Sequence, residues 1–581
     1  MLNFLEKRSE RFWIIIVFIF TIPTFYQLIK PGFFFMQDDL QAFRIHQMFA
    51  CFKDFQIPCR WVPDMGYQYG YPQFLFYPPS VYYVGAFIHL LGVQIIDSVK
   101  IMFILGLILS TQFMFIFLKV FLQTELNDKQ FSKTILPAFI GSMLYTYAPY
   151  KALEVYVRGA MSEFWGLVFY PLIFLTIYQL ITKKKLKHMI FFSLSIAGLM
   201  LTHNLMTLIF APIAILWTII LIILKKDLKV LPKIISGGLL GIGLAAFFSL
   251  PVIFEGRYVH LETLQGGYFD YRQHFVNIYR LFISNIWGYG SSGFNQDNQL
   301  TLSTGQIQWF TALVGFILSL VFFRKQKKLA IITITLSLVE ILILFLIHQK
   351  SSFIWEKLPI LWWLQFPWRF LTDSIFMLSI LGAITVYYLN FVNKKVTLIF
   401  SLGVLISIFV LHSQFFTPKD WSNLTDKDKF SGNLWEKQLT ISIFDYLPIY
   451  AKFPPNHKAP EKPEIIDGQA EITFYQKGSN YQMGEVIVKK DATLRLPLLD
   501  FPGMKVLVDN KLIDHQNNDC RGQEYCFGQI SFKLPEGQYK FKVQLEDTSI
   551  RIIGNITTLI SALIIFGLAL KERNRKDVGK I

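Results

Sequence analysis

Long apolar runs separated by short basic loops constrain this chain more than any other feature. Runs such as Phe12–Ile29, Ile234–Phe254 and Val396–His412 are long enough, at about 1.5 Å per residue, to cross about 30 Å of hydrocarbon. Similar runs recur along the 581 residues, 53% of which are hydrophobic. The pattern predicts a polytopic α-helical membrane protein. The first run lacks a small-residue cleavage site, so we expect it to be retained as a span.

The net charge of +16 is concentrated in the loops between these runs. This is the positive-inside pattern, and it predicts that the basic loops are cytoplasmic. A nucleic-acid-binding protein would instead carry a basic face on a folded domain, so nucleic acid is excluded as a partner. The basic clusters are Lys7, Arg8 and Arg11; Lys183 to Lys187; Lys225 to Lys233; Arg324 to Lys328; Lys394 and Lys395; and Lys571 to Lys580.

Counting apolar runs between the basic loops predicts about 12 transmembrane helices with both termini cytoplasmic. A shorter aromatic stretch, Pro79–Gly92, carries His89 and is expected to lie in the membrane interface, which keeps the number of crossings even. The predicted spans are 12–29, 98–122, 134–149, 164–182, 188–203, 205–224, 234–254, 306–323, 329–348, 368–390, 396–413 and 551–570.

Three parts of the chain follow from this topology. Residues 1–413 form a transmembrane module with two large outer segments, 31–92 and 255–305. Residues 414–548 are predicted to form a small extracytoplasmic β-sandwich, because they contain alternating strand-like runs and an Asp509-Asn510 hairpin turn. Residues 549–581 supply the last helix and a basic cytoplasmic tail.

All four cysteines fall outside the cytoplasm under this topology, where disulfides persist. Pairing Cys51 with Cys59 and Cys520 with Cys526 is the simplest arrangement, and ordinary free thiols are the alternative.

Two adjacent carboxylates, Asp38 and Asp39, follow the first span on the outer side. Acids beside the membrane are costly unless they are used or well solvated. Either could act as a general base that deprotonates a hydroxyl group. Either could instead cap the amphipathic helix expected over Gln41–Phe55, and the two roles are compatible.

The stretch that follows this helix is rich in Gly, Pro and aromatic residues. Its rings could stack on sugars, or they could form an ordinary interfacial belt. The candidate substrate-binding residues here are Trp61, Asp64, Tyr67, Tyr69 and Tyr71, and Arg60 precedes them.

Further polar side chains are predicted at the same outer face. Arginine suits bidentate capture of phosphate oxygens, although a lone arginine near the membrane surface can also extend to lipid headgroups. The functional interpretation rests on convergence of an acid pair, arginines and a histidine at one face. These candidates are Glu154, Arg158, Glu163, His203, Asn204, Trp368 and Arg369.

Several motifs resemble those of a family of bacterial membrane proteins. The acid pair after the first span and the C-terminal β domain resemble the GT-C superfamily of membrane glycosyltransferases. Over nearly the whole chain the closer likeness is to YfhO-like proteins, often labelled "6-pyruvoyl-tetrahydropterin synthase-related". The pterin chemistry of that label is not expected, because no His cluster has zinc-ligand spacing. The motifs are Phe35–Leu40, Gly66–Pro79, Val157–Glu163, Leu201–Leu205, Gln365–Arg369, Asp445–Pro448 and Phe501–Asn510.

The GT-C likeness implies an inverting glycosyltransferase with a polyprenyl-phosphate sugar donor and an extracytoplasmic hydroxyl acceptor of the cell envelope. It implies that Asp38 or Asp39 is the base, and that Arg158, Arg369 or Arg60 stabilises the departing lipid phosphate. The family often has His where this chain has Gln37, which leaves His46 or His203 as assistants. No cofactor is implied. A divalent metal stays open, with Asp64, Glu154 and Asp270 as oxygen ligands.

Two other functions compete with this one. A transporter or flippase for a lipid-linked intermediate would carry ionisable groups or broken helices within the bilayer. Glu340, Asp373 and the glycine-rich run Gly237–Gly243 are the features that could serve it, although close helix packing explains the glycines equally well. The remaining alternative is a non-catalytic assembly protein whose β domain recruits envelope partners.

Overall fold

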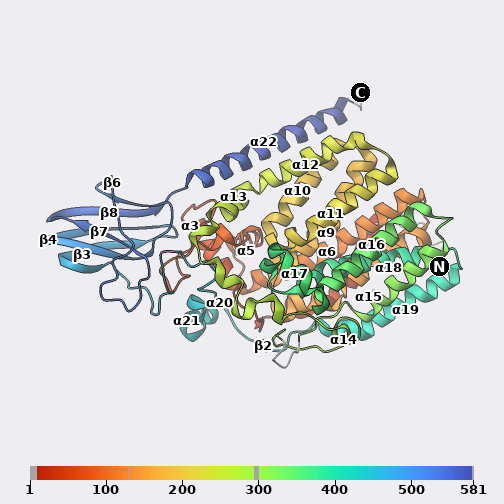
Figure 1. Ribbon diagram of the computed structural model, residues 1–581, viewed down its shortest axis with the longest axis horizontal. Coiled ribbons are helices and arrows are strands. Elements are labelled where there is room, and N and C mark those ends of the chain that lie inside the picture. Colours follow the sequence, from red (N-terminus) through yellow and green to blue (C-terminus); the bar gives the residue numbers. More distant parts are fainter. Residues whose placement is uncertain (1–8, 129, 294–299, 579–581) are drawn as a thin grey trace.

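The computed structural model describes residues 9–128, 130–293 and 300–578. Lys7, Arg8 and Lys580 of the predicted basic clusters lie outside these residues. Figure 1 shows an elongated molecule with a body of helices at one end and a β-sheet at the other. Both chain ends lie on the part of the helical body away from the sheet (Figure 1), which agrees with an even number of crossings.

The helical body has a helix at each of the predicted spans. In the described part of the chain, seven helices are long and apolar enough to cross a membrane, or eight if one bent pair counts as a single span. Others, such as α2 and α7, are shorter than the roughly 20 residues that a crossing needs. The count of about 12 therefore stays a prediction. The helices are α2 (Glu10–Thr21), α6 (Ile95–Leu126), α7 (Leu136–Thr146), α9 (Met161–Lys183), α10 (Leu186–Thr202), α11 (Asn204–Lys225), α12 (Leu231–Leu244), α13 (Ala246–Glu255), α15 (Gln306–Val321), α16 (Lys327–Ile347), α18 (Leu371–Leu389), α19 (Lys394–His412) and α22 (Ser549–Val578).

The bent pair consists of α12 and α13, whose axes differ by 73°. The bend follows the glycine-rich run directly. A side chain at Gly241 would meet the backbone of α10 at Ser193, and one at Gly243 would meet Ser561 of α22. The run therefore serves both purposes weighed from the sequence, since it precedes a bend and lets two helices approach closely.

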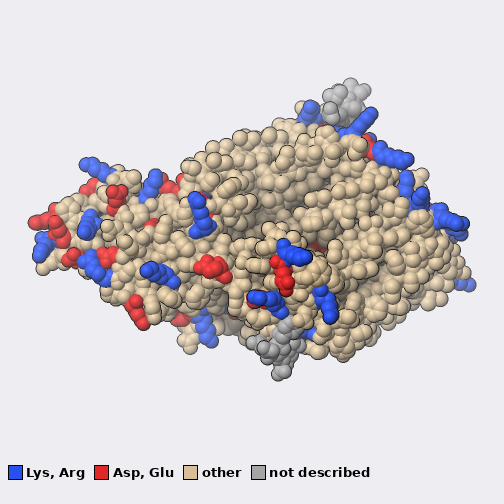
Figure 2. Space-filling model, in the orientation of Figure 1, with Lys and Arg blue, Asp and Glu red and all other residues tan. Residues whose placement is uncertain are grey.

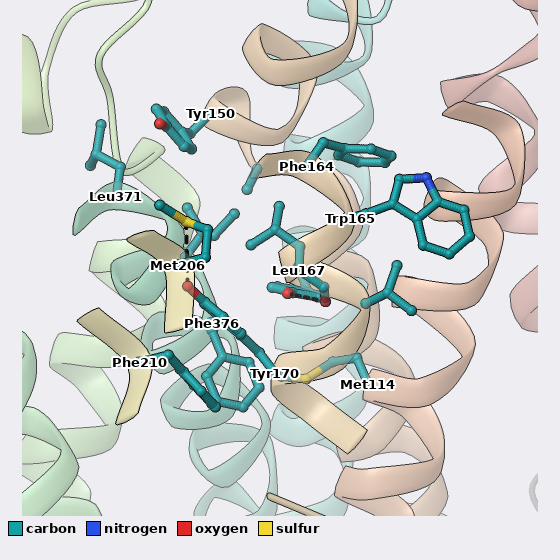
Figure 3. Packing of buried hydrophobic residues seen from close by; sticks show 14 of the residues in the cluster. Met114, Tyr150, Phe164, Trp165, Leu167, Tyr170, Met206, Phe210, Leu371 and Phe376 are labelled. Atoms are coloured by element: carbon teal, nitrogen blue, oxygen red, sulfur yellow. Dashed lines mark hydrogen bonds between the residues drawn. The ribbon is translucent and has the colours of Figure 1, made fainter. Parts of the chain in front are cut away.

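Helix α18 lies at the centre of the body, with every one of its residues buried. Around it, Tyr170 of α9 stacks on Phe210 of α11 with ring centroids 3.8 Å apart, and Phe376 of α18 meets both rings edge-on (Figure 3). This aromatic packing fixes the start of α18, so the side chains there are rigidly placed.

The first outer segment forms helices α3 (Gln41–Lys53), α4 (Gln73–Phe76) and α5 (Ser80–Leu90). The predicted amphipathic helix is therefore confirmed as α3, and the short aromatic helix as α5, which packs on α3. Leu40 precedes α3, and no side chain caps its free amides. The alternative in which Asp38 or Asp39 caps this helix is therefore wrong, because both carboxylates bond to side chains instead.

The C-terminal β domain is a six-stranded antiparallel sheet in the order β3-β4-β8-β5-β6, with β7 paired to β4. The predicted hairpin turn is confirmed: Asp509 and Asn510 have φ of 46° and 64°, as this turn requires, and join β5 to β6. The strands are β3 (Glu464–Lys477), β4 (Tyr481–Leu499), β5 (Met504–Val508), β6 (Lys511–Ile513), β7 (Gln529–Leu534) and β8 (Gly537–Leu545).

The β domain packs directly on the first outer segment. The second half of β4 is buried on both faces, and its leucines share a core with Trp61, Tyr69 and Phe76. Before the sheet, β2 (Trp421–Ser422) pairs with β1 (Phe33–Phe34), and two short helices follow, α20 (Asp426–Lys429) and α21 (Gly432–Thr440). Residues 31–92 and 414–463 therefore build one layer between membrane body and sheet.

Both predicted disulfides are present. Cys51 pairs with Cys59 and Cys520 with Cys526, with Cα–Cα distances of 5.6 Å and 5.0 Å. The first closes the end of α3 onto the next loop, and the second closes a loop of the β domain.

Basic side chains mark the end of the helical body that lies away from the sheet. In Figure 2, Lys and Arg gather at this end, near the C-terminus, whereas basic and acidic side chains are intermixed on the β domain. Lys184, Lys185, Lys187, Lys233 and Lys571 line one groove at the basic end. This is the distribution that the positive-inside rule predicts for a cytoplasmic end.

Candidate functional site

The acid pair is fixed by backbone hydrogen bonds to a distant turn. The amides of Gln37 and Asp38 donate to the carbonyl oxygens of Val157 and Arg158, at 2.9 Å and 2.8 Å. The turn, η4 (Leu153–Arg158), ends at Gly159, whose φ of +65° favours glycine. A side chain at Gly159 would also collide with Met36. The sequence thus brings the acids and an arginine-bearing turn together through main-chain contacts.

Asp38 presents one held oxygen and one open oxygen. Its Oδ2 accepts hydrogen bonds from Gln41 Nε2 at 2.9 Å and Arg44 Nη1 at 3.4 Å. Its Oδ1 has no partner within the described ranges, and the side chain is 36% exposed. Gln41 is itself fixed by Tyr82, whose hydroxyl donates to Gln41 Oε1 at 2.8 Å. A carboxylate oriented on one side and free on the other is suited to accept a proton.

Arg44 of α3 was missed by the sequence analysis. Its side chain is buried, lies 4.2 Å from the ring centre of Tyr77, and donates to the hydroxyls of Tyr77 and Tyr82. Asp38, Gln41 and Arg44 recur every three residues, the spacing of one helix face, so this signal was available.

Asp39 makes a different contact. Its Oδ2 accepts from Lys429 Nζ of α20 at 2.5 Å, and Lys429 is itself buried. Burial raises the pKa of Asp39, although Lys429 acts in the opposite direction. The two neighbouring acids are thus separated: Asp38 faces Arg44, whereas Asp39 ties α20 to the first outer segment.

A buried ion-pair cluster lies next to Asp38. Arg158 pairs with both Glu154 and Glu163, at 3.0 Å for the latter, and Arg369 Nε lies 3.2 Å from the same carboxylate oxygen, Oε2 of Glu163. Trp368 lies beneath Arg158, with 4.6 Å between the guanidinium carbon and the ring centre. Five of the predicted residues therefore meet. They come from η4, α9 and the short helix η12 (Pro367–Phe370).

His203 lies between α10 and α11, near the ion-pair cluster. Its Nδ1 accepts from the amide of Met206 at 3.3 Å, so it caps α11. The side chain of His203 is buried. Asn204 has only a local contact with the amide of Leu205. His46, the other proposed assistant, lies beside Asp64 at 3.8 Å and stacks on Phe430.

A third carboxyl group, that of Asp445, interacts electrostatically with Arg44 and Asp38. Burial raises the pKa of Asp445 to about 6, with Arg44 lowering it and Asp38 raising it further. The sequence marked Asp445–Pro448 as a motif without giving it a role. Its place beside the site comes from Tyr71, whose hydroxyl bonds the chain at 442–446.

Arg60 lies apart from the other arginines. Its Nε is 2.8 Å from Asp547, and its terminal nitrogens donate to Asn555 of α22 and the carbonyl of Phe247 in α13. It joins the first outer segment to the last helix.

The aromatic residues of the first outer segment serve mainly as contacts to the C-terminal part. Trp61 and Tyr69 are 1% exposed and Tyr71 is fully buried, and the backbone of Tyr67 bonds Leu439 and Ala459. Sugar stacking on the three buried rings would require this layer to open.

The three acids considered as metal ligands have separate partners. Asp64 bonds Gln47 at 2.8 Å, Glu154 pairs with Arg158, and Asp270 pairs with Arg272. Across residues 9–128, 130–293 and 300–578, no group of three or more His, Cys, Asp or Glu side chains is placed to hold a metal ion.

Comparisons with known proteins give weak likenesses. No family model matches the chain. An uncharacterized protein from Lactococcus lactis subsp. cremoris (strain MG1363) is 26% identical over 381 residues, which cover 63% of this chain and 55% of that protein. The chain thus spans about half the length of this curated relative.

Two solved glycosyltransferases are similar to the chain. Arabinofuranosyltransferase AftD from mycobacteria is 12% identical with a TM-score of 0.44, over 72% of this chain and 29% of that one. Archaeal oligosaccharyltransferase AglB from Archaeoglobus fulgidus is 12% identical with a TM-score of 0.40, over 71% and 56%. Similarity at this level establishes neither a family nor a reaction for the chain.

Proposed function

We propose that this protein is an inverting glycosyltransferase that moves a sugar from a polyprenyl-phosphate donor to a hydroxyl acceptor of the cell envelope. The observation that carries the proposal is the Asp38 carboxylate, held by Gln41 and Arg44 through one oxygen and open at the other, beside the arginine-bearing turn. One group can then remove a proton while its neighbours stabilise an anion.

The proposed reaction uses these residues in one displacement step. The acceptor hydroxyl gives its proton to Oδ1 of Asp38, and its oxygen attacks the anomeric carbon of the donor sugar. The bond between that carbon and the phosphate oxygen breaks, and its electron pair remains on the lipid phosphate. Attack opposite the leaving group inverts the anomeric centre.

The leaving phosphate needs a cationic site, and Arg158 and Arg369 supply it. Glu163 already bridges the two guanidinium groups, and Glu154 contacts the same Nη1 of Arg158 that Glu163 contacts. Burial raises the pKa of Glu154, so this carboxyl is easily neutralised. A phosphate that replaces Glu154 on Arg158 would keep the arginine paired while Glu163 holds both arginines in place.

We place this site outside the cytoplasm in the cell membrane, with both termini and the basic loops inside. The two disulfides support this side, because such bonds persist in oxidising compartments. A membrane-impermeant thiol reagent applied to intact cells should label a cysteine introduced at Lys489 of β4 and should not label one introduced at Lys184. The reverse pattern would contradict the proposed orientation.

The enzymatic proposal is tested with purified protein in lipid nanodiscs and a panel of radiolabelled polyprenyl-phosphate sugars. We expect release of polyprenyl phosphate from one donor, dependent on an added envelope extract as acceptor. Movement of intact donor across sealed vesicles without cleavage would instead identify a transporter. Absence of both activities, with function in cells dependent only on residues 414–548, would favour the assembly protein.

A further inference from the structure

Two acidic side chains lie inside the helical body, away from the candidate site's open face. Glu340 of α16 is 4% exposed and Asp373 of α18 is fully buried. The two helices pack on each other, and the hydroxyl of Ser374 donates to Glu340 Oε1 at 2.5 Å. Ser374 follows Asp373 directly, so this hydrogen bond brings Glu340 to the turn of α18 that carries Asp373.

These carboxyl groups lack the partners that buried charges need. In the part of the chain that the structure describes, both oxygens of Asp373 and Oε2 of Glu340 have no hydrogen-bond partner. The hydroxyl of Ser337, one turn before Glu340 and also buried, has none either. An ionised carboxylate in an apolar interior costs several kcal/mol or more unless it is paired.

Among the residues that the structure describes, neither carboxylate forms an ion pair or a hydrogen bond with a lysine or an arginine. Tyr170 on α9 and Tyr145 on α7 place hydroxyl groups close to Asp373. Lys151 is buried nearby, but its ammonium group donates to the hydroxyl of Ser110 and makes a cation–π contact with the ring of Tyr145. Two negative charges in this setting would repel each other without compensation.

We propose that Glu340 and Asp373 form a proton-binding site within the membrane body, in which the two carboxyl groups hold at least one proton at neutral pH. A proton needs only one of these oxygens, whereas a metal ion needs several ligands, and the described residues place no group of three or more His, Cys, Asp or Glu side chains together. This inference does not rest on the proposed glycosyl transfer.

The proton site is coupled to the ion-pair cluster through α18. Asp373 follows Arg369 by four residues, about 6 Å along a helix axis. Loss of the proton places a negative charge one turn from Arg369, which competes with Glu163 for the guanidinium. By linkage, the charge on Arg369 favours release of the proton.

Infrared spectroscopy of the protein in nanodiscs tests the proposal. We expect the carbonyl stretch of a protonated carboxylic acid at pH 7, shifted in Glu340→Gln and in Asp373→Asn, and reduced by one acid in the double variant. Asp270→Asn, which alters an exposed ion pair, is the matched control and should leave the band unchanged. A double variant with the wild-type band would overturn the proposal.

Two further readouts do not depend on the folding of the double variant. In the wild-type protein the band should disappear reversibly as pH rises, and in Arg369→Gln it should persist to higher pH; disappearance at the same pH would contradict the coupling. Sodium or potassium that raises the wild-type Tm, without effect on Glu340→Gln, would show a cation site in place of a proton site.

Discussion

The backbone amide of Asp38 donates a hydrogen bond to the carbonyl oxygen of Arg158 at 2.8 Å. This contact places a carboxylate beside the ion-pair cluster through the main chain alone, so Oδ1 of Asp38 stays without a partner in the described residues while Arg158 pairs with Glu154 and Glu163. It also makes the position of Asp38 depend on the turn that ends at Gly159. Main-chain hydrogen bonds therefore set the relative position of Asp38 and Arg158, and their side chains supply the charges of the site.

Asp39 should matter for stability more than for transfer. Asp39→Asn removes the partner of Lys429, a buried cation, and should lower Tm while leaving most of the transfer activity. The double variant Asp39→Asn with Lys429→Met should recover part of the lost Tm, because no charge is left unpaired. Thermal unfolding of wild type, Asp39→Asn, Lys429→Met and the double variant in detergent measures this, and equal losses of Tm in the single and double variants would contradict it.

Loss of Arg369 alone should destabilise the protein, whereas loss of both Arg369 and Glu163 should not. Arg369→Gln leaves Glu163 with Arg158 as its remaining cation and should destabilise the fold by an amount on the order of a few kcal/mol. Arg272→Gln, in an exposed pair, is the control and should cost roughly 0–1 kcal/mol. Adding Glu163→Gln to Arg369→Gln should restore stability but not donor turnover, and chemical denaturation with a turnover assay distinguishes the two effects.

Arg60 should act as a structural residue. Arg60→Gln loses the contacts to Asp547 and Asn555 and should lower Tm, while single-turnover transfer at permissive temperature stays near the wild-type rate. A variant with unchanged Tm and lost transfer would return Arg60 to the phosphate-binding role implied by the family resemblance.

Stability should depend on pH through Asp445. Its pKa in the folded protein is raised from 3.8 to about 6, so the folded state binds more protons than the unfolded state between these values. Stability contributed by this group therefore falls as pH rises from 4 to 6, and the loss is complete above pH 6. Asp445→Asn should gain stability over the wild type across this window, by on the order of 1 to 3 kcal/mol. Tm measured from pH 4 to pH 8 tests this, and a constant difference between the two proteins would contradict it.

Much of the fold follows from local sequence signals. Basic loops and apolar runs predict where helices lie, because each helix meets the membrane almost independently of its neighbours. Asp509-Asn510 predicts its hairpin because the turn needs two residues tolerant of positive φ. The cysteine pairs are close in sequence, which makes their pairing simple to anticipate. Helix ends were less predictable, since α2 and α7 stop short of the apolar runs that contain them.

The division of labour within the site depends on contacts that local patterns do not encode. Asp38 and Asp39 are adjacent in sequence, and they differ because Gln41 and Arg44 hold Asp38, whereas Lys429, 390 residues away from Asp39, holds Asp39. Arg60 and Arg369 likewise look alike until Asp547 and Glu163 are seen beside them. Asp445 gains its role from a loop held by Tyr71. The family resemblance located the region, and tertiary packing separated its members.

The most direct test of the account compares wild-type protein with Asp38→Asn in a single-turnover assay with the matching polyprenyl-phosphate sugar and its acceptor. Asp97→Asn, at a half-exposed acid on α6, serves as the control. We expect wild type and control to transfer the sugar with inversion, and Asp38→Asn to bind the donor with unchanged affinity yet to transfer at least about 100-fold more slowly. Transfer by Asp38→Asn at the wild-type rate would contradict it.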